Sequence, residues 1–198
     1  MPKNDKVPSY PDLAGRVAVV TAGSGGIGAA ACRLLAAHSA KAVLNGRDLA
    51  KINDVVDKIQ ANCGTAAGVA ADCTDPVQRL RQRTEEEFGP ADVLAAFAGG
   101  GQARPGPVTE VSEQDWQSTK DGSLTATFLA LKSPLPDMMQ RGQGAILTVA
   151  SSAARLSGLG APAPYVAAKA GVIALTRQAA AEAGRQGVRA YCLVWPRS

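Results

Sequence analysis

Residues 16–37 read RVAVVTAGSGGIGAAACRLLAA, and this stretch decides the fold. It begins with a short aliphatic run with a β-branched centre, which is typical of a strand covered on both faces. A glycine-rich turn follows at once, and the Ala- and Leu-rich segment after it predicts a helix over residues 29–39. A strand, a glycine turn and a helix in this order predict the first unit of an α/β domain.

The same alternation continues to the end of the chain. Further short apolar segments predict strands at residues 42–44 (before the turn-like Asn45 and Gly46), 66–71, 92–99, 145–151 and 188–195. Helices are expected at residues 48–62, 75–88 and 165–185, and from residue 112 through 131, where Pro134 and Pro136 bend or end the helix. This alternation implies a doubly wound parallel sheet of about six strands with helices on both faces, whose carboxyl ends meet at one ligand crevice.

The composition is that of one soluble α/β domain. The chain has 198 residues, 46% of them hydrophobic, and 21 Lys and Arg against 17 Asp and Glu give a net charge of +4. These charges are scattered, so a nucleic-acid partner has little support, and no apolar run reaches the roughly 20 residues that span a membrane. Residues 1–14 predict a loose N-terminal arm without a signal peptide, before a single domain at residues 15–198. The four cysteines lack the spacing of a zinc site, so we expect a cytoplasmic protein with no metal.

The glycine-rich turn predicts a nucleotide site. It fits the spacing G-x-G-x-x-G over residues 23–28 and the spacing T-A-x-x-x-G-I-G over residues 21–28. A turn without Cβ atoms lets a pyrophosphate approach the helix N-terminus, whose partial positive charge stabilises an anion. The alternative is a strand-to-helix turn that merely needs glycine. A strand before it and a helix after it favour the nucleotide.

The end of the second strand bears on the choice of cofactor. An acidic side chain there binds the ribose 2′-hydroxyl of NAD, whereas an arginine suits the 2′-phosphate of NADP. Here Gly46 leaves that place empty and Arg47 follows it, so NADP is favoured. Asp48, one residue on, keeps NAD open, and Arg47 as a solvated loop residue is the alternative.

A tyrosine and a lysine stand four residues apart in the segment YVAAK, at Tyr165 and Lys169. On a helix this spacing places both on one face. Lowering the pKa of a phenol from about 10 to near 7 requires about 4 kcal/mol. One ammonium about 4 Å away at an effective dielectric near 20 supplies a term of that size. The tyrosine would then exchange a proton with a carbonyl or alcohol oxygen. A surface tyrosine beside a solvated lysine is the alternative.

Together these motifs resemble those of the short-chain dehydrogenase/reductase family. TAGSGGIG is similar to the family's TGxxxGIG, ADCTD to DVTD, AFAG to NNAG and YVAAK to YxxxK, and Ser152 lies 13 residues before Tyr165, as in the family. The order and spacing agree over residues 13–195, which makes the resemblance specific. It implies a Rossmann-type fold and an NAD(P)-dependent oxidoreductase for alcohols, ketones or 3-oxoacyl compounds, commonly a dimer or tetramer.

The resemblance also implies the site residues. Tyr165 would be the acid/base, Lys169 would tune it, and Ser152 would hydrogen-bond the substrate oxygen. Ser151 stays an alternative to Ser152, because a shift of one residue turns a strand side chain to the other face. The implied catalytic residues are Ser152, Tyr165, Lys169 and Ser123. The implied cofactor-binding residues are Thr21, Gly23, Ser24, Gly26, Ile27, Gly28, Arg47, Asp72, Cys73, Ala98, Gly99, Tyr165 and Lys169.

Several positions depart from the family pattern. Ala22 stands at the first glycine, and Ala96 and Phe97 replace two asparagines whose side-chain hydrogen bonds tie the sheet together. Ser123 stands where the family has an asparagine that holds a proton-relay water, so we expect an impaired relay. The resemblance implies a substrate-covering loop and a seventh strand after residue 195, and we expect residues 1–198 to form neither. Two hypotheses therefore stand: an active NADP(H)-dependent oxidoreductase, and a non-catalytic, truncated NAD(P)-binding protein.

Overall fold

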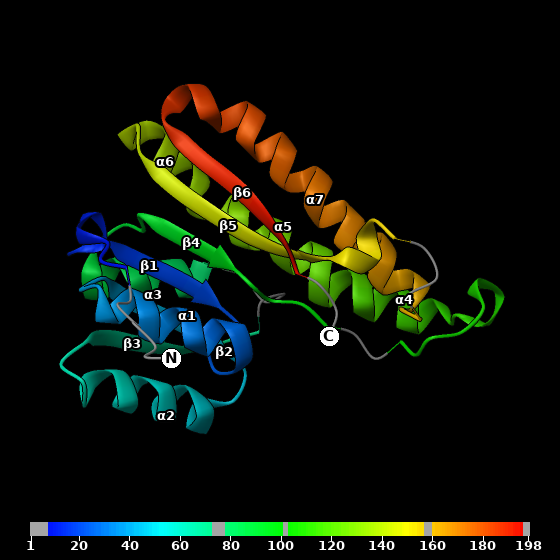
Figure 1. Cartoon of the computed structure of the whole chain (residues 1–198), viewed down its shortest axis with the longest axis horizontal. Coiled ribbons are helices and arrows are strands. Elements are labelled where there is room, and N and C mark those ends of the chain that lie inside the picture. Colours follow the sequence, from blue (N-terminus) through cyan, green and yellow to red (C-terminus); the bar gives the residue numbers. More distant parts are fainter. Residues whose placement is uncertain (1–7, 73–77, 101–102, 157–159, 196–198) are drawn as a thin grey trace, which may run out of the picture.

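A six-stranded parallel sheet forms the centre of the computed structural model, which describes residues 8–72, 78–100, 103–156 and 160–195 (Figure 1). The strands lie in the order β3-β2-β1-β4-β5-β6. Their bounds are β1 (Val17–Thr21), β2 (Lys41–Gly46), β3 (Thr65–Ala70), β4 (Val93–Ala96), β5 (Gly144–Ser151) and β6 (Val188–Trp195). Every neighbouring pair is parallel, which confirms the predicted doubly wound sheet. The strand order reverses between β1 and β4, where such sheets form a ligand crevice.

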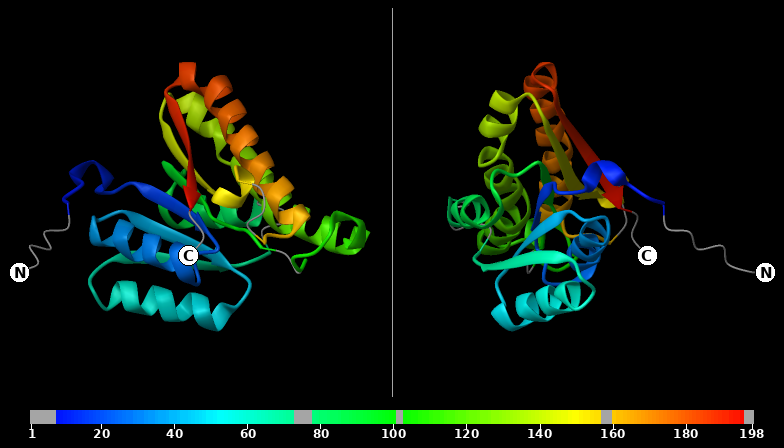
Figure 2. Two further views of the ribbon diagram at one scale, coloured as in Figure 1. Left: turned by 45° about the vertical axis from the view of Figure 1, so that its right-hand side comes forward. Right: turned by 90° about the vertical axis from the view of Figure 1, so that its left-hand side faces the viewer.

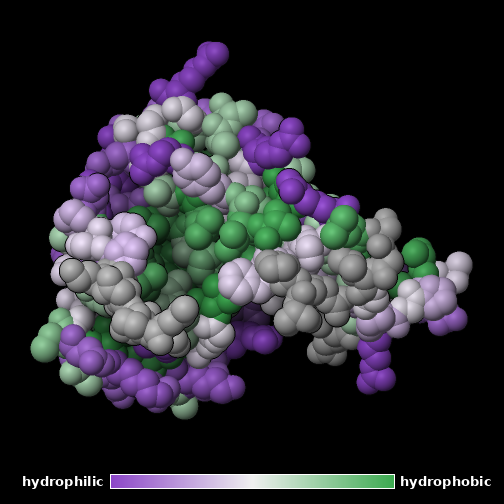
Figure 3. All heavy atoms as spheres, viewed as in Figure 1, coloured by the Kyte–Doolittle hydropathy of each residue, from purple (hydrophilic) through white to green (hydrophobic). Residues whose placement is uncertain are grey.

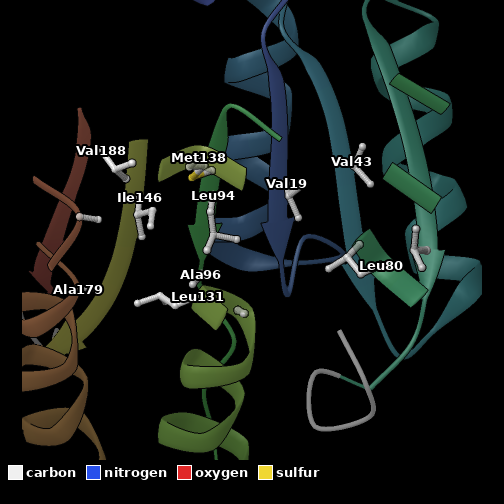
Figure 4. Packing of buried hydrophobic residues seen from close by; sticks show 13 residues of the cluster. Val19, Val43, Leu80, Leu94, Ala96, Leu131, Met138, Ile146, Ala179 and Val188 are labelled. Carbon is white, nitrogen blue, oxygen red and sulfur yellow. The ribbon is translucent and has the colours of Figure 1, made fainter. Parts of the chain in front are cut away.

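Helices cover both faces of the sheet, as Figures 1 and 2 show. Residues of α1 (Gly26–Ala37) and α2 (Leu49–Gln60) pack on one face around Val20, Leu44 and Ala95. Residues of a second group of helices pack on the opposite face with Val19, Leu94 and Ile146, and Figure 4 shows this cluster. These helices are α3 (Gln78–Phe88), α5 (Ala126–Lys132), α6 (Leu135–Arg141) and α7 (Ala163–Ala183). Adjacent Val19 and Val20 enter different clusters, which explains why β1 reads as a continuous apolar run.

The segment predicted as one long helix from residue 112 is divided into several pieces. It consists of α4 (Glu113–Lys120), a π-helical turn (Asp121–Thr125) and α5. A further helix, α6, then begins directly after Pro134 and carries Pro136 in its first turn, where the prediction expected the helical segment to bend or end. Proline is tolerated in a first turn because the N–H that it lacks has no helical partner there.

The two ends of the described chain differ in their contacts. In the predicted N-terminal arm, Pro11–Leu13 form a 3₁₀ helix, and the backbone N–H of Tyr10 donates to His38 Nδ1 at 3.4 Å. Within the described residues, β6 pairs only with β5. Its outer side chains Tyr191 and Trp195 are exposed, and Figure 3 shows hydrophobic residues gathered in a hollow on this side of the molecule. None of the described helices combines the length and apolar character that a membrane crossing needs.

Candidate functional site

A cleft of about 490 Å³ lies at the carboxyl ends of the first four strands, where the topology predicts a ligand crevice. Its walls come from the loops after β1 to β4 and from the segment that joins α4 to α5. The lining residues are Ala22, Ser24, Gly46, Arg47, Ala71, Asp72, Ala98, Gly99, Gly100, Ser118, Asp121, Gly122 and Ala126. The structure thus brings Ser24, Arg47, Asp72, Ala98 and Gly99 of the predicted cofactor set to one cleft.

The glycine turn packs too closely for side chains at two positions. A Cβ atom on Gly23 would lie 2.6 Å from the Cβ of Leu44, and one on Gly28 would lie 2.2 Å from the carbonyl oxygen of Ala22. Ala22 itself has a φ of 54°, a left-handed conformation that costs an alanine about 1–2 kcal/mol. The tight turn therefore forms although alanine replaces the family's first glycine.

The N-terminus of α1 is open beside this turn. The helix begins at Gly26 after the N-cap residue Gly25, and no side chain caps it. Gly26 and Ile27 are exposed. Backbone N–H groups of a first helical turn that lack a side-chain partner are suited to hold an anion.

Thr21 serves the protein backbone. Its Oγ1 accepts hydrogen bonds from the backbone N–H groups of Phe97 and Ala98, both at 3.0 Å. These bonds draw the chain after Ala96 toward β1, so β4 ends at Ala96 and not at the predicted residue 99. They also connect β1 to the loop after β4, where Ala96 and Phe97 replace the family's two asparagines.

The ends of β2 and β3 present opposite charges at the rim of the cleft. Arg47 and Asp72 are both exposed cleft residues, and Cys73 lies outside the described residues. Asp48 caps α2 by accepting from the backbone N–H groups of Ala50 at 3.0 Å and Lys51 at 3.2 Å. The bond from Lys51 is the main reason that the pKa of Asp48 is lowered. The Asp48 carboxylate is thus engaged at the helix start.

The two candidate serines after β5 have different environments. Ser151 is the last residue of β5 and is buried, and its hydroxyl accepts from the backbone N–H of Ala153 at 3.2 Å. It thereby caps a 3₁₀ helix, Ser152–Ala154. Ser152 is half-buried at the start of that helix. Of the two candidate serines, Ser152 is therefore the more exposed, and Ser151 is engaged at the end of the strand.

Tyr165 and Lys169 lie one turn apart near the start of α7. The Nζ of Lys169 is 5.9 Å from the ring centre of Tyr165 and donates to the carbonyl oxygen of Val149 at 2.9 Å. A Cβ atom on Gly99 would lie 2.7 Å from this Nζ, so the ammonium lies against the backbone of a cleft residue. Lys169 is only 5% exposed, and burial lowers its pKa, an effect that Cys192 opposes. A half-buried tyrosine, a buried ammonium and the cleft wall therefore meet at one place.

Ser123 is fully buried in the π-helical turn. Its hydroxyl accepts from the backbone N–H of Gly100 at 3.1 Å and donates to the carbonyl oxygen of the same residue at 3.0 Å. The sequence predicts an impaired proton relay at this serine. In the structure its hydroxyl clamps the loop after β4 through the two bonds to Gly100.

Replacing Ser123 with alanine is expected to lower the free energy of unfolding by about 1–3 kcal/mol, because two polar groups of Gly100 lose their partner. Urea unfolding of the variant measures this loss. Ser118→Ala is the matched control, since the Ser118 hydroxyl is exposed and bonds only within α4. Equal stability of the two variants would contradict a clamp at Ser123.

The doubly wound sheet, the glycine turn at a helix N-terminus and the cleft at the point where strand order reverses define a Rossmann-type α/β protein. No cluster of three or more His, Cys, Asp or Glu side chains suited to a metal occurs in the described parts of the chain. The family model of short chain dehydrogenases matches residues 16–196, and the chain belongs to this family.

Similar proteins agree with this assignment. The (2S)-[(R)-hydroxy(phenyl)methyl]succinyl-CoA dehydrogenase subunit of Thauera aromatica is 34% identical over 180 residues, which are 90% of this chain and 71% of that protein. A 3-oxoacyl-[acyl-carrier-protein] reductase of Vibrio cholerae is 33% identical over 179 residues, covering 89% of this chain and 71% of the reductase. A metagenomic short-chain oxidoreductase solved in complex with NADP has a TM-score of 0.86 and 32% identity, over 92% of this chain and 82% of that one.

Proposed function

We propose that the chain is an NADP(H)-dependent oxidoreductase that transfers a hydride between the nicotinamide and the carbonyl or alcohol group of a small ketone or 3-oxoacyl substrate. The observation that carries this proposal is the buried Lys169 ammonium, which lies against Gly99 and 5.9 Å from the ring centre of Tyr165. The NADP bound to the metagenomic relative and the activities named for the other two relatives support it.

The described residues fit a nicotinamide dinucleotide. The uncapped N-terminus of α1 suits the pyrophosphate, and the tight turn between β1 and α1 keeps side chains away from it. Arg47 and Asp72 at the cleft rim suit the adenosine end, and Ala98 and Gly99 lead toward the Tyr165–Lys169 pair. The bound cofactor would supply or accept the hydride.

The protein's part in the reaction is the movement of a proton. In the direction of reduction, the carbonyl carbon gains the hydride while the Tyr165 hydroxyl gives its proton to the carbonyl oxygen. Ser152 donates a hydrogen bond to that oxygen and stabilises the charge that develops on it. The Lys169 ammonium stabilises the phenolate left on Tyr165. The reverse sequence oxidises an alcohol.

A preference for NADP(H) follows from the two charged residues after β2. Asp48 is engaged as the cap of α2, whereas Arg47 is exposed at the cleft rim. Arg47→Ala is therefore expected to raise the Kd for NADPH about 10- to 100-fold, the effect of losing one charge-assisted contact worth about 1.5–3 kcal/mol. The Kd for NADH is expected to change by less than about twofold, because NADH lacks the 2′-phosphate. Fluorescence titration with both cofactors measures the two constants.

Lys58→Ala is the control for the loss of one positive charge, because Lys58 is exposed near the other end of α2 and pairs with Asp54. Its Kd for NADPH is expected to stay at the wild-type value. Equal weakening of NADPH and NADH by Arg47→Ala would overturn the assignment of the 2′-phosphate to Arg47.

A non-catalytic NAD(P)-binding protein is the second candidate, and the observation that favours it is the engagement of the Ser123 hydroxyl with the backbone of Gly100. Titration with NADPH, followed by a screen of ketones and 3-oxoacyl compounds for NADPH consumption, separates the two. Binding with no turnover that depends on Tyr165 would support the second candidate.

The proposal includes a homo-oligomer, a dimer or tetramer, in the cytoplasm. Trp116 on α4 and Phe128 on α5 expose 44% and 45% of their surface, and α4 packs beside α7. Large exposed aromatic side chains are enriched at protein interfaces. Light scattering of the purified chain tests the assembly, and a monomeric mass would contradict it.

A further inference from the structure

Asn45 is a buried amide within an aliphatic sheet. The sequence pattern treated it as a turn residue, but it lies within β2 and is only 1% exposed. Its Nδ2 donates to the carbonyl oxygens of Val69 at 3.3 Å and Ala71 at 2.9 Å. A polar side chain in such surroundings is tolerated only when it is hydrogen-bonded, so these contacts fix its orientation.

The amide extends the pairing of β2 with β3 beyond its last regular pair, Gly46 with Ala70. The backbone N–H of Ala71 still donates to the carbonyl oxygen of Gly46 at 2.9 Å. The carbonyl of Ala71 is then held by the Asn45 side chain, in place of a backbone partner. Asp72, the next residue, is thereby held at the cleft rim.

The same residue also contacts the glycine turn. The backbone N–H of Gly23 donates to the carbonyl oxygen of Asn45 at 2.8 Å. A Cβ atom on Gly46 would lie 2.6 Å from the Oγ of Ser24, so the turn and the end of β2 are in contact. Asn45 is thus bonded to the segments on both sides of it and directly precedes Gly46 and Arg47 in the chain.

We propose that Asn45 is a positioning residue for the adenosine end of the cofactor. Its amide holds the end of β3 level with the end of β2, so that Asp72 and Arg47 face one ligand from the two sides. The inference rests on the proposed function and extends it. Asn45 acts through its neighbours, so its loss weakens binding of the adenosine half of either cofactor, whereas loss of Arg47 weakens only NADPH.

Fragments of the cofactor test this role in the full chain. Asn45→Leu removes both donor hydrogens and keeps the number and branching of the side-chain heavy atoms, and Asn45→Thr keeps one donor. Calorimetry would measure Kd for 2′,5′-ADP and 5′-AMP, which carry the adenosine half, and for reduced nicotinamide mononucleotide, which lacks it. Asn45→Leu is expected to raise both adenosine-nucleotide Kd values at least tenfold, about the effect of one to two buried hydrogen bonds, with Asn45→Thr between it and wild type. The mononucleotide Kd is expected to change by less than about twofold.

Asn62→Leu is the matched control, because Asn62 is exposed and its amide donates to the carbonyl of Lys58 at the end of α2. Circular dichroism verifies that each variant is folded, and Asn45→Thr decides the test if Asn45→Leu is not. Wild-type affinity for 2′,5′-ADP in the folded variant, or equal loss for both halves of the cofactor, would overturn the positioning role. If the wild-type chain binds neither half, the proposed function fails as well.

Discussion

Replacing Tyr165 with phenylalanine is expected to lower turnover about 10²- to 10⁴-fold, the usual contribution of one proton-transferring group. The substitution removes only the hydroxyl and leaves an aromatic ring near the Lys169 ammonium, which lies 5.9 Å from the ring centre in the wild type. The Kd for NADPH is therefore expected to stay within about twofold of the wild-type value. Turnover is measured as NADPH consumption on the best substrate of the screen, and Kd by fluorescence titration.

Tyr191→Phe provides the matched control. Tyr191 lies on the exposed outer face of β6, where its side chain is 60% exposed, so the same chemical change occurs on a different part of the surface. Its turnover is expected to equal that of the wild type. If Tyr165→Phe retained wild-type turnover, Tyr165 would not be the acid/base of this protein.

The fold could be predicted because its signals are local. Residues 16–37 contain an apolar run, a glycine turn and an Ala-rich segment, and each of these patterns involves only residues that are close in the sequence. In the structure they form β1, the turn after it and α1. The strand at residues 188–195 was predicted with the bounds that β6 has. Tyr165 and Lys169 were paired correctly on one face, because a spacing of four residues fixes that relation on a helix.

Three side chains show what sequence reasoning could not supply. Thr21, Asn45 and Ser123 each bond the backbone of a segment distant in the sequence, at residues 97–98, 69–71 and 100. Sequence spacing gives no information about such contacts, since they depend on how strands and helices pack in space. A polar residue within an otherwise aliphatic strand was the only signal for Asn45. All three side chains hold loops at the cleft, so the cleft depends on buried polar contacts as well as on glycines.

Replacing Lys169 is expected to have the second large effect, because the proposed reaction needs its charge whereas the stability of the fold is lowered by it. Burial lowers the pKa of Lys169 below the ordinary value of 10.5. A lowered folded-state pKa means that the charged ammonium destabilises the fold wherever it is protonated. This destabilisation is complete below the folded-state pKa and disappears as the pH rises toward 10.5.

Lys169→Met is therefore expected to be inactive yet more stable than the wild type. Methionine has a similar length and no charge, so at about pH 7 the free energy of unfolding is expected to rise by about 1 kcal/mol, with the lost bond to Val149 offsetting part of the gain. Turnover is expected to fall at least about 100-fold, because the phenolate of Tyr165 loses its counter-charge. Urea unfolding at about pH 7 and about pH 10 measures the stability, and the difference between variant and wild type is expected to shrink at the higher pH.

Arg177→Met serves as the control for the loss of a cation from α7, because Arg177 is exposed on that helix. Its free energy of unfolding is expected to stay within about 0.5 kcal/mol of the wild-type value, and its turnover within about twofold. A Lys169→Met variant that is less stable than the wild type at both pH values would mean that the fold needs the ammonium. Higher stability of the variant together with its loss of turnover would support the proposed reaction, in which a buried charge that weakens the fold stabilises the phenolate of Tyr165.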